Sequence, residues 1–359
     1  MIRLMATALV DLAAVLMPAR LRHWGERMRC EVAAIEAPGE ALRFAAGCLW
    51  GAICEMIRVQ SGGGKMAMWR SRRLVGLCAI GATGLGIGYM TIGGAPLSYP
   101  LRNVAALLIG FLALGIVMHL PRSRWLAPGP VLIALGLALL ATSLFGITHD
   151  GATRWVSIGG LGIQPSLILM PVLAIGYAGV RDRLSTLGVI AAAAALALQP
   201  DRAMAGGLAA GLAALALLRP ERNVLAALIA ALAGFVAALL QPDVQPAMPY
   251  VDQILFTAFG VHPLAGLMVV AGSVLLLVPA LAGWRRDPAY AVFGALWLAI
   301  VLAAALGNYP TPLVGYGGSA IVGYLLSLLG LPGALGAAGT VADKAEPGAE
   351  HGMLRVGIA

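Results

Sequence analysis

The polar residues that could do chemistry are gathered in four short segments of an otherwise apolar chain. The four segments contain Arg154 and Trp155 followed by Gln164, Pro165 and Ser166; Gln199, Pro200 and Asp201; Pro249 to Asp252; and Gly315 to Ser319. A carboxylate can accept a proton, and an arginine can bind an anion through several N–H groups. These residue types therefore suit proton transfer beside an anionic ligand, provided that the fold brings them together.

Each segment also has a purely structural interpretation. Trp155 and Tyr316 suit the interface between lipid and water, where aromatic side chains are enriched. Asp201 follows Gln199 and Pro200 and suits a helix cap. The glycines beside Tyr316 suit a tight turn that requires positive φ. Taken one at a time, the segments do not distinguish a ligand site from a set of loops and caps.

Composition sets the class of the elements that position these residues. Hydrophobic residues make up 60% of the chain and charged residues 11%, and the mean hydropathy is +0.89. This leaves too little polar surface to cover a soluble globule, so the sequence predicts an all-α polytopic membrane protein. The net charge of +8 comes almost wholly from arginine and lacks the interleaved aromatic residues of a nucleic-acid surface. The cysteines lack the spacing of a zinc site.

Ten apolar runs follow residue 73, and about 20 apolar residues suffice to span a bilayer as a helix. The predicted helices lie at 74–92, 101–120, 125–146, 164–180, 184–199, 203–218, 223–240, 252–283, 288–307 and 315–332. The eighth run is long and is interrupted by His262 and Pro263. We expect His262 to be packed or hydrogen-bonded rather than to carry protons.

The arginines give the bundle an orientation, because loops on the cytoplasmic side are enriched in positive charge. If residue 73 is cytoplasmic, the inner loops hold Arg122, Arg124, Arg181, Arg183, Arg219, Arg222, Arg285 and Arg286. The outer loops hold only Arg102, Arg154 and Arg202. All four polar segments then lie on the outer side of the membrane.

The two ends of the chain differ from this core. Residues 1–73 interleave charged and apolar positions, which predicts an amphipathic segment at the cytoplasmic membrane surface. The run from Phe44 to Ile57 is short and contains Glu55, so we expect it to lie at the interface rather than to span the bilayer. Residues 336–359 lose hydrophobicity and are predicted to be a disordered cytoplasmic tail. The core is thus predicted to cover 74–335.

The order of the polar segments resembles that of the SEDS family, the FtsW/RodA/SpoVE cell-division and cell-shape proteins. The segments that carry the resemblance are Gly151-Ala152-Thr153-Arg154-Trp155-Val156, Gln164-Pro165-Ser166-Leu167, Gln199-Pro200-Asp201, Val251-Asp252-Gln253 and Gly315-Tyr316-Gly317-Gly318-Ser319-Ala320. The resemblance extends over roughly residues 74–335 and includes the number of helices and their sidedness. Its first and last motifs are specific, and its match at Asp252 is weak.

The resemblance implies a ten-helix bundle in the bacterial cytoplasmic (inner) membrane that handles lipid II at the outer leaflet during peptidoglycan synthesis. Catalytic members polymerise lipid II beside a penicillin-binding transpeptidase partner. An outer carboxylate would take a proton from the attacking sugar hydroxyl, and an arginine or a divalent cation would neutralise the departing pyrophosphate. The implied base is Asp252. The implied substrate-binding residues are Arg154, Trp155, Gln164, Ser166, Gln199, Asp201, Tyr316, Gly317, Gly318 and Ser319.

The chain departs from the family pattern at two places. Leu167 stands where the family motif ends in glutamate, so one outer carboxylate is missing. The large outer loop before the eighth helix is reduced here to residues 241–251, and Val261 and His262 replace an acidic pair. Three functions therefore stay open: a glycosyltransferase, a catalytically inactive protein that binds a lipid-linked precursor or acts as a scaffold, and a lipid flippase or transporter. Whether the process is division or shape control is also open.

Overall fold

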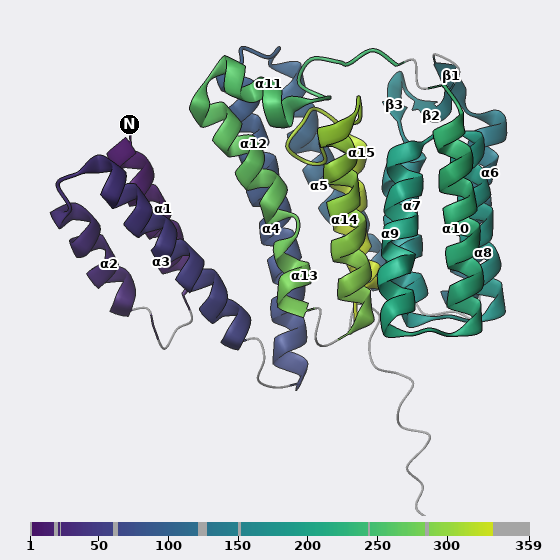
Figure 1. Ribbon diagram of the computed structural model, residues 1–359, viewed down its shortest axis with the longest axis horizontal. Helices are drawn as coiled ribbons and strands as arrows, with labels where there is room; N and C mark the ends of the chain where they lie inside the picture. Colours follow the sequence, from purple (N-terminus) through teal and green to yellow (C-terminus); the bar gives the residue numbers. More distant parts are fainter. Residues whose placement is uncertain are drawn as a thin grey trace, which may run out of the picture.

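The computed structural model describes residues 2–17, 21, 23–59, 64–120, 128–149, 152–242, 245–283 and 287–332. Several predicted features lie outside the described residues: the tail at 336–359, Gly151, and the arginines at 122, 124, 285 and 286. The described chain is dominated by roughly parallel and antiparallel helices (Figure 1). It confirms the all-α membrane class predicted from composition.

Each of the ten predicted apolar runs contains a helix. These helices are α4 (Gly64–Ile92), α5 (Ser98–His119), α6 (Pro128–Phe145), α7 (Pro165–Gly179), α8 (Arg183–Leu198), α9 (Arg202–Leu218), α10 (Arg222–Leu240), α12 (Pro263–Leu275) with α13 (Val278–Gly283), α14 (Pro288–Leu306), and α15 (Gly318–Leu326) with the 3₁₀ turn η3 (Ser327–Gly330). Six of the spans in the described chain are at least 18 residues long and apolar enough to cross a membrane. The protein is therefore a polytopic helical membrane protein.

The eighth run is divided into separate helices. The helix α11 (Ile254–Val261) ends before His262, and α12 begins at Pro263. Proline is tolerated at a helix start because its missing N–H would be unpaired there. The ring nitrogen Nδ1 of His262 accepts a hydrogen bond from the backbone N–H of Leu264 at 3.1 Å. His262 thus caps α12, in keeping with the structural role expected for it.

Small residues let the helices approach closely. A Cβ atom on Gly136 of α6 would lie 2.1 Å from the carbonyl oxygen of Gly188 on α8, and one on Gly323 of α15 would lie 1.9 Å from the carbonyl oxygen of Leu167 on α7. Lipid tails are as apolar as leucine, so helix association in a membrane relies on such close van der Waals packing. The dense alanine and glycine of the core therefore have a structural role.

The segment after α6 forms a small sheet rather than an irregular loop. Its antiparallel strands, in order, are β1 (Ile147–His149), β2 (Ala152–Ile158) and β3 (Leu161–Ile163). The turn between β2 and β3 consists of Gly159 and Gly160, with φ values of 58° and 80°. Two successive positive φ values favour glycine and match the twist of a two-residue hairpin. The sheet covers the same end of the bundle as α11 (Figure 1). We call this end of the bundle, which holds the cavity described below, the cavity end.

The N-terminal region is also helical, as predicted. It contains α1 (Ile2–Leu16), α2 (His23–Ala34) and α3 (Pro38–Val59), which includes the run from Phe44 to Ile57. Val10 of α1 and Ala45 of α3 are fully buried in a small core of these helices. The three helices lie beside α4 at one side of the bundle (Figure 1). The helix α4 starts at Gly64 and runs through the boundary predicted at residue 73.

We predict that Gly136→Val destabilises the bundle, because the added atoms would collide with the backbone of α8. Overpacking a core costs about 1–3 kcal/mol, so the thermal unfolding midpoint in detergent should fall. The control is Gly115→Ala on α5, where a Cβ would meet nothing within 4 Å. Equal midpoints for the two variants would contradict the close approach of α6 and α8.

Candidate functional site

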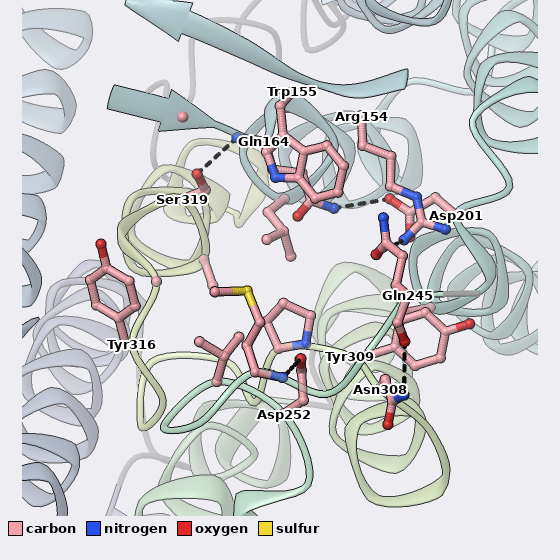
Figure 2. Close-up of a pocket in the computed structure, with 18 of the residues that line it drawn as sticks. Arg154, Trp155, Gln164, Asp201, Gln245, Asp252, Asn308, Tyr309, Tyr316 and Ser319 are labelled. Carbon is pink, nitrogen blue, oxygen red and sulfur yellow. Dashed lines mark hydrogen bonds between the residues drawn. The ribbon is translucent and has the colours of Figure 1, made fainter. Parts of the chain in front are cut away.

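The four polar segments meet around one cavity of about 710 Å³ at the cavity end of the bundle. Figure 2 shows Trp155 and Arg154 on one side of the cavity, Asp252 facing them and Tyr316 on the side away from Arg154. The predicted site residues that line it are Arg154, Trp155, Gln164, Asp201, Asp252, Tyr316, Gly317, Gly318 and Ser319. The fold thus gathers residues that are separated by up to 165 positions in the sequence.

Arg154 reaches from β2 to the end of α8. Its Nε donates to the carbonyl oxygen of Gln199 at 3.0 Å, and another guanidinium nitrogen donates to the carbonyl oxygen of Pro200. The last carbonyls of a helix lack partners within the helix, and a cation there also complements the helix dipole. The side chain is only 5% exposed. Arg154 therefore fixes the sheet to α8 and leaves a buried positive charge at the cavity wall.

Asp201 is the centre of a buried hydrogen-bond network. Its Oδ2 accepts from Gln164 Nε2 at 3.1 Å and from Ser166 Oγ at 2.9 Å. Its Oδ1 accepts from the backbone N–H of Met204 at 3.3 Å, so it caps α9. Asp201 is 1% exposed. Its lone pairs are used by α7 and α9, which makes it a positioning carboxylate rather than a free base.

Asp252 lies on the short segment between α10 and α11. Its Oδ2 accepts from the backbone N–H of Met248 at 2.8 Å, which closes a tight turn. The neighbouring backbone is paired with the segment before α15: Thr311 N–H donates to Val251 O, and Tyr316 N–H donates to Tyr250 O. The shortened loop is therefore held in place by backbone pairing. Asp252 lines the cavity and is 9% exposed.

The Gly315-to-Gly318 loop depends on a residue that the sequence did not single out. Asn103 of α5 is fully buried; its Nδ2 donates to Gly315 O at 2.9 Å, and its Oδ1 accepts from Gly317 N–H at 3.2 Å. Gly315 has no room for a side chain, because a Cβ would lie 2.9 Å from Thr311 O. Asn103 and this close approach set the position of the loop.

Tyr316 is held by the first turn of the same helix. Its ring stacks on Tyr99 with ring centroids 4.0 Å apart and planes 12° apart. Arg102 donates to the Tyr316 hydroxyl oxygen. The sequence signal for these contacts was present, because Arg102 and Asn103 are adjacent polar residues at the start of an apolar run. Their role required knowledge of which loop they face.

Two further amide residues line the cavity, Gln245 and Asn308, and neither was predicted from the sequence. Asn308 Nδ2 donates to Gln245 O at 2.9 Å, and Gln253 Nε2 donates to Asn308 Oδ1 at 2.7 Å. Arg154 donates to Gln245 Oε1 at a longer 3.4 Å. Figure 2 shows Gln245 and Asn308 side by side next to Tyr309. Single amides in loops carry little signal in a sequence, so only the fold identifies this group.

Two predicted residues do not line the cavity. Ser166 and Gln199 lie behind its wall, where Ser166 donates to Asp201 and Gln199 Nε2 donates to Leu139 O at 3.2 Å. Leu167, which replaces the glutamate of the family motif, does line it and presents an apolar surface. The described residues contain no group of three or more His, Cys, Asp or Glu that could hold a metal ion.

The fold and the site together define a polytopic helical membrane protein with a polar cavity at one end of its bundle. The chain belongs to the FtsW/RodA/SpoVE family of cell cycle proteins, whose pattern matches residues 75–282. This confirms the resemblance found in the sequence motifs.

Several known proteins are similar to this chain over part of their length. A probable peptidoglycan glycosyltransferase FtsW of Halomonas elongata is 34% identical over 93 residues, which is 25% of this chain and 24% of that protein. A protein of the same name from Nitrosococcus halophilus is 29% identical over 143 residues, or 33% of this chain and 37% of that protein. The matched segments of these two relatives thus span less than two fifths of their length.

A solved structure is also similar. The rod shape determining protein RodA of Thermus thermophilus has 21% sequence identity and a TM-score of 0.47, with 71% of this chain and 93% of that chain covered.

We predict that Asn103→Leu loosens the Gly315-to-Gly318 loop, because the carbonyl of Gly315 and the N–H of Gly317 would lose their partner. Leaving buried polar groups unpaired costs about 1–3 kcal/mol. The thermal midpoint should fall, while Val104→Ala, at an exposed neighbouring position, should leave it nearly unchanged. A midpoint for Asn103→Leu that equals that of the parent protein would show that these hydrogen bonds do not stabilise the loop.

Proposed function

We propose that this protein is a peptidoglycan glycosyltransferase that polymerises lipid II at the outer face of the bacterial cytoplasmic membrane. The observation that carries the proposal is the meeting of the Asp252 carboxylate and the buried Arg154 guanidinium at one cavity. Membership of the FtsW/RodA/SpoVE family supports it. The names of the partly matching relatives agree with it.

The reaction joins two sugars. A hydroxyl oxygen of the acceptor saccharide attacks C1 of the donor saccharide, and the bond between C1 and the diphosphate oxygen breaks. The diphosphate leaves with the bonding electron pair, and the hydroxyl proton passes to a base. Asp252 is the carboxylate for this step, because the other described carboxylate at the cavity, Asp201, accepts three hydrogen bonds from its own surroundings. General base catalysis of this kind contributes typically about 10²–10⁴-fold.

Arg154 supplies charge for the leaving group. Among the described residues, it donates to the neutral oxygens of Gln199, Pro200 and Gln245. A buried cation whose acceptors are neutral leaves a positive potential in the cavity, where the low dielectric strengthens attraction for a diphosphate. Negative charge grows on the diphosphate as its bond to C1 breaks, so the same arginine stabilises the transition state.

The short loop is compatible with this role. Backbone pairing of residues 250–251 with residues 311–316 holds Asp252 at the cavity without the long loop of the family pattern. The apolar Leu167 removes one acidic group, and this favours the second candidate function, a protein that binds a lipid-linked precursor without polymerising it. An activity measurement separates the two.

We predict that purified protein polymerises labelled lipid II and that Asp252→Ala lowers the rate by about 100-fold or more, as loss of a general base would. Asp252→Asn tests the carboxylate with nearly the same shape. The control is Asp182→Asn, which changes an exposed carboxylate that caps α8 on the opposite side of the bundle. Absence of polymer under conditions that suit an active family member would favour the binding protein, and unchanged activity of Asp252→Ala would reject Asp252 as the base.

The orientation and the partner follow from the same proposal. The cavity end faces outward and the start of α4 lies on the cytoplasmic side, because Arg181, Arg183, Arg219 and Arg222 gather at the opposite end of the bundle. The partner class that the family resemblance implies is a penicillin-binding transpeptidase, which would cross-link the glycan strand. The process served is division or shape control.

In this proposal the N-terminal helices form a separate module, on the cytoplasmic side or at the lipid–water interface. Arg29 Nε pairs with Asp11 Oδ1 at 2.6 Å, and both side chains are more than half exposed, so this pair joins α2 to α1 at a polar surface. Trp24 of α2 and Trp50 of α3 are also exposed. A charged surface that also presents aromatic rings suits the boundary between lipid and water.

We predict that a variant without residues 1–65 still inserts as a bundle but changes its localisation or its partner binding. Insertion is measured by extraction and protease accessibility, and localisation by fluorescence of a fused reporter. If the shortened chain no longer inserts, the N-terminal helices belong to the core fold and are not a separate module.

A further inference from the structure

A second arginine contacts the wall of the cavity, through Tyr316 on the side away from Arg154. Arg102 of α5 is exposed, and it donates to the hydroxyl of Tyr316, a residue of the cavity wall. Its guanidinium carbon lies 5.9 Å from the centroid of the Tyr316 ring. Figure 2 shows Tyr316 and Arg154 at opposite sides of the cavity, with Asp252 on a third side. One cation, Arg154, thus lines the cavity, and a second, Arg102, contacts the opposite wall through Tyr316.

Arg102 and Arg154 lack the carboxylate partner that some other arginines of the described chain have. Arg181 pairs with Glu221 at 3.0 Å, and Arg29 pairs with Asp11 at 2.6 Å. At the cavity, no carboxylate of the described residues forms an ion pair with Arg102 or Arg154. The third arginine at this end, Arg202, donates to backbone carbonyls at the end of α10. Two cations at the cavity thus keep their charge for another anion.

The hydroxyl of Tyr316 adds a directed donor beside Arg102. Because Arg102 donates to the phenol oxygen, the phenol keeps its own proton to donate. Stacking on Tyr99 fixes the plane of the Tyr316 ring, and Asn103 holds the backbone on both sides of Tyr316. A guanidinium with a neighbouring hydroxyl in a fixed place is a donor set that suits phosphate oxygens.

The proposed reaction has two diphosphates to accommodate. One saccharide loses its polyprenyl diphosphate, whereas the other supplies the attacking hydroxyl and keeps its own. Both must be bound at the same moment, each carrying negative charge. A single arginine can neutralise only part of the negative charge of one diphosphate.

We infer that Arg102 and the hydroxyl of Tyr316 form a second diphosphate site, which holds the polyprenyl diphosphate that is retained while Arg154 holds the one that leaves. This rests on the proposed function. The assignment follows burial: Arg154 is buried, where charge acts most strongly on a transition state, and Arg102 is exposed, where it contributes to ground-state binding. The two saccharides would then meet near Asp252.

The test is the number of diphosphates bound by the whole purified chain in detergent. Isothermal titration with farnesyl diphosphate should give two equivalents per chain, and farnesol, which lacks the phosphates, should give none. Arg102→Gln should remove one equivalent, and Tyr316→Phe should weaken the same equivalent by about tenfold, the loss of one charge-assisted hydrogen bond. Inorganic pyrophosphate as a second probe shows whether the headgroup alone suffices.

The controls separate binding from folding and from catalysis. Arg219→Gln changes an exposed arginine at the opposite end of the bundle and should keep both equivalents. Arg154→Gln should remove the other equivalent, and Arg154→Lys, which keeps the buried charge, should retain both equivalents. One equivalent for the parent protein, or two for Arg102→Gln, would overturn the second site. Two equivalents without any polymer would retain the site and reject the glycosyltransferase instead.

Kinetics give a further readout if polymer forms. Arg102→Gln should raise KM for lipid II with little change in kcat, whereas Arg154→Lys should lower kcat. Equal losses of kcat in both variants would contradict the division of roles between the two arginines.

Discussion

The cavity depends on how the backbone carbonyls at the end of α8 find hydrogen-bond donors. These carbonyls lack partners within their own helix, and unpaired backbone groups are costly in a bundle shielded from water. Arg154 supplies the donors from β2, so the small sheet is drawn over α8 and the cavity gains a wall. One interaction thus satisfies a helix end, positions the sheet and places a positive charge where a ligand can meet it.

The shortened outer loop is likewise held in place by contacts with another part of the chain. A long loop can form a cleft by its own packing, but the segment before α11 is too short to do so. It pairs its backbone with the segment before α15, and the amides of Gln245, Gln253 and Asn308 tie the two together. Each of the two segments thus helps to order the other. The carboxylate of Asp252 is consequently set by a neighbouring element as much as by its own loop.

The sequence predicted the helices well because runs of apolar residues in a membrane protein leave few alternatives. It also identified the lining residues Arg154, Asp252 and Tyr316, since polar groups are conspicuous in such a chain. It did not predict the sheet, although the adjacent Gly159 and Gly160 are typical of a hairpin turn. Asn103 and Asn308 were missed for another reason: each acts through a contact between distant segments, and its amide type alone does not show which segment it meets.

The hydrogen bonds of Asn103 connect the cavity mechanically to the bilayer. Only 22% of the α5 span is buried within the protein, so most of this helix faces its surroundings. Because Asn103 grips the backbone on both sides of Tyr316, a tilt of α5 would move that edge of the cavity with it. The width of the cavity would then vary with the thickness of the bilayer, because helix tilt adjusts to that thickness. The surrounding lipid would thus help to set the shape of the cavity.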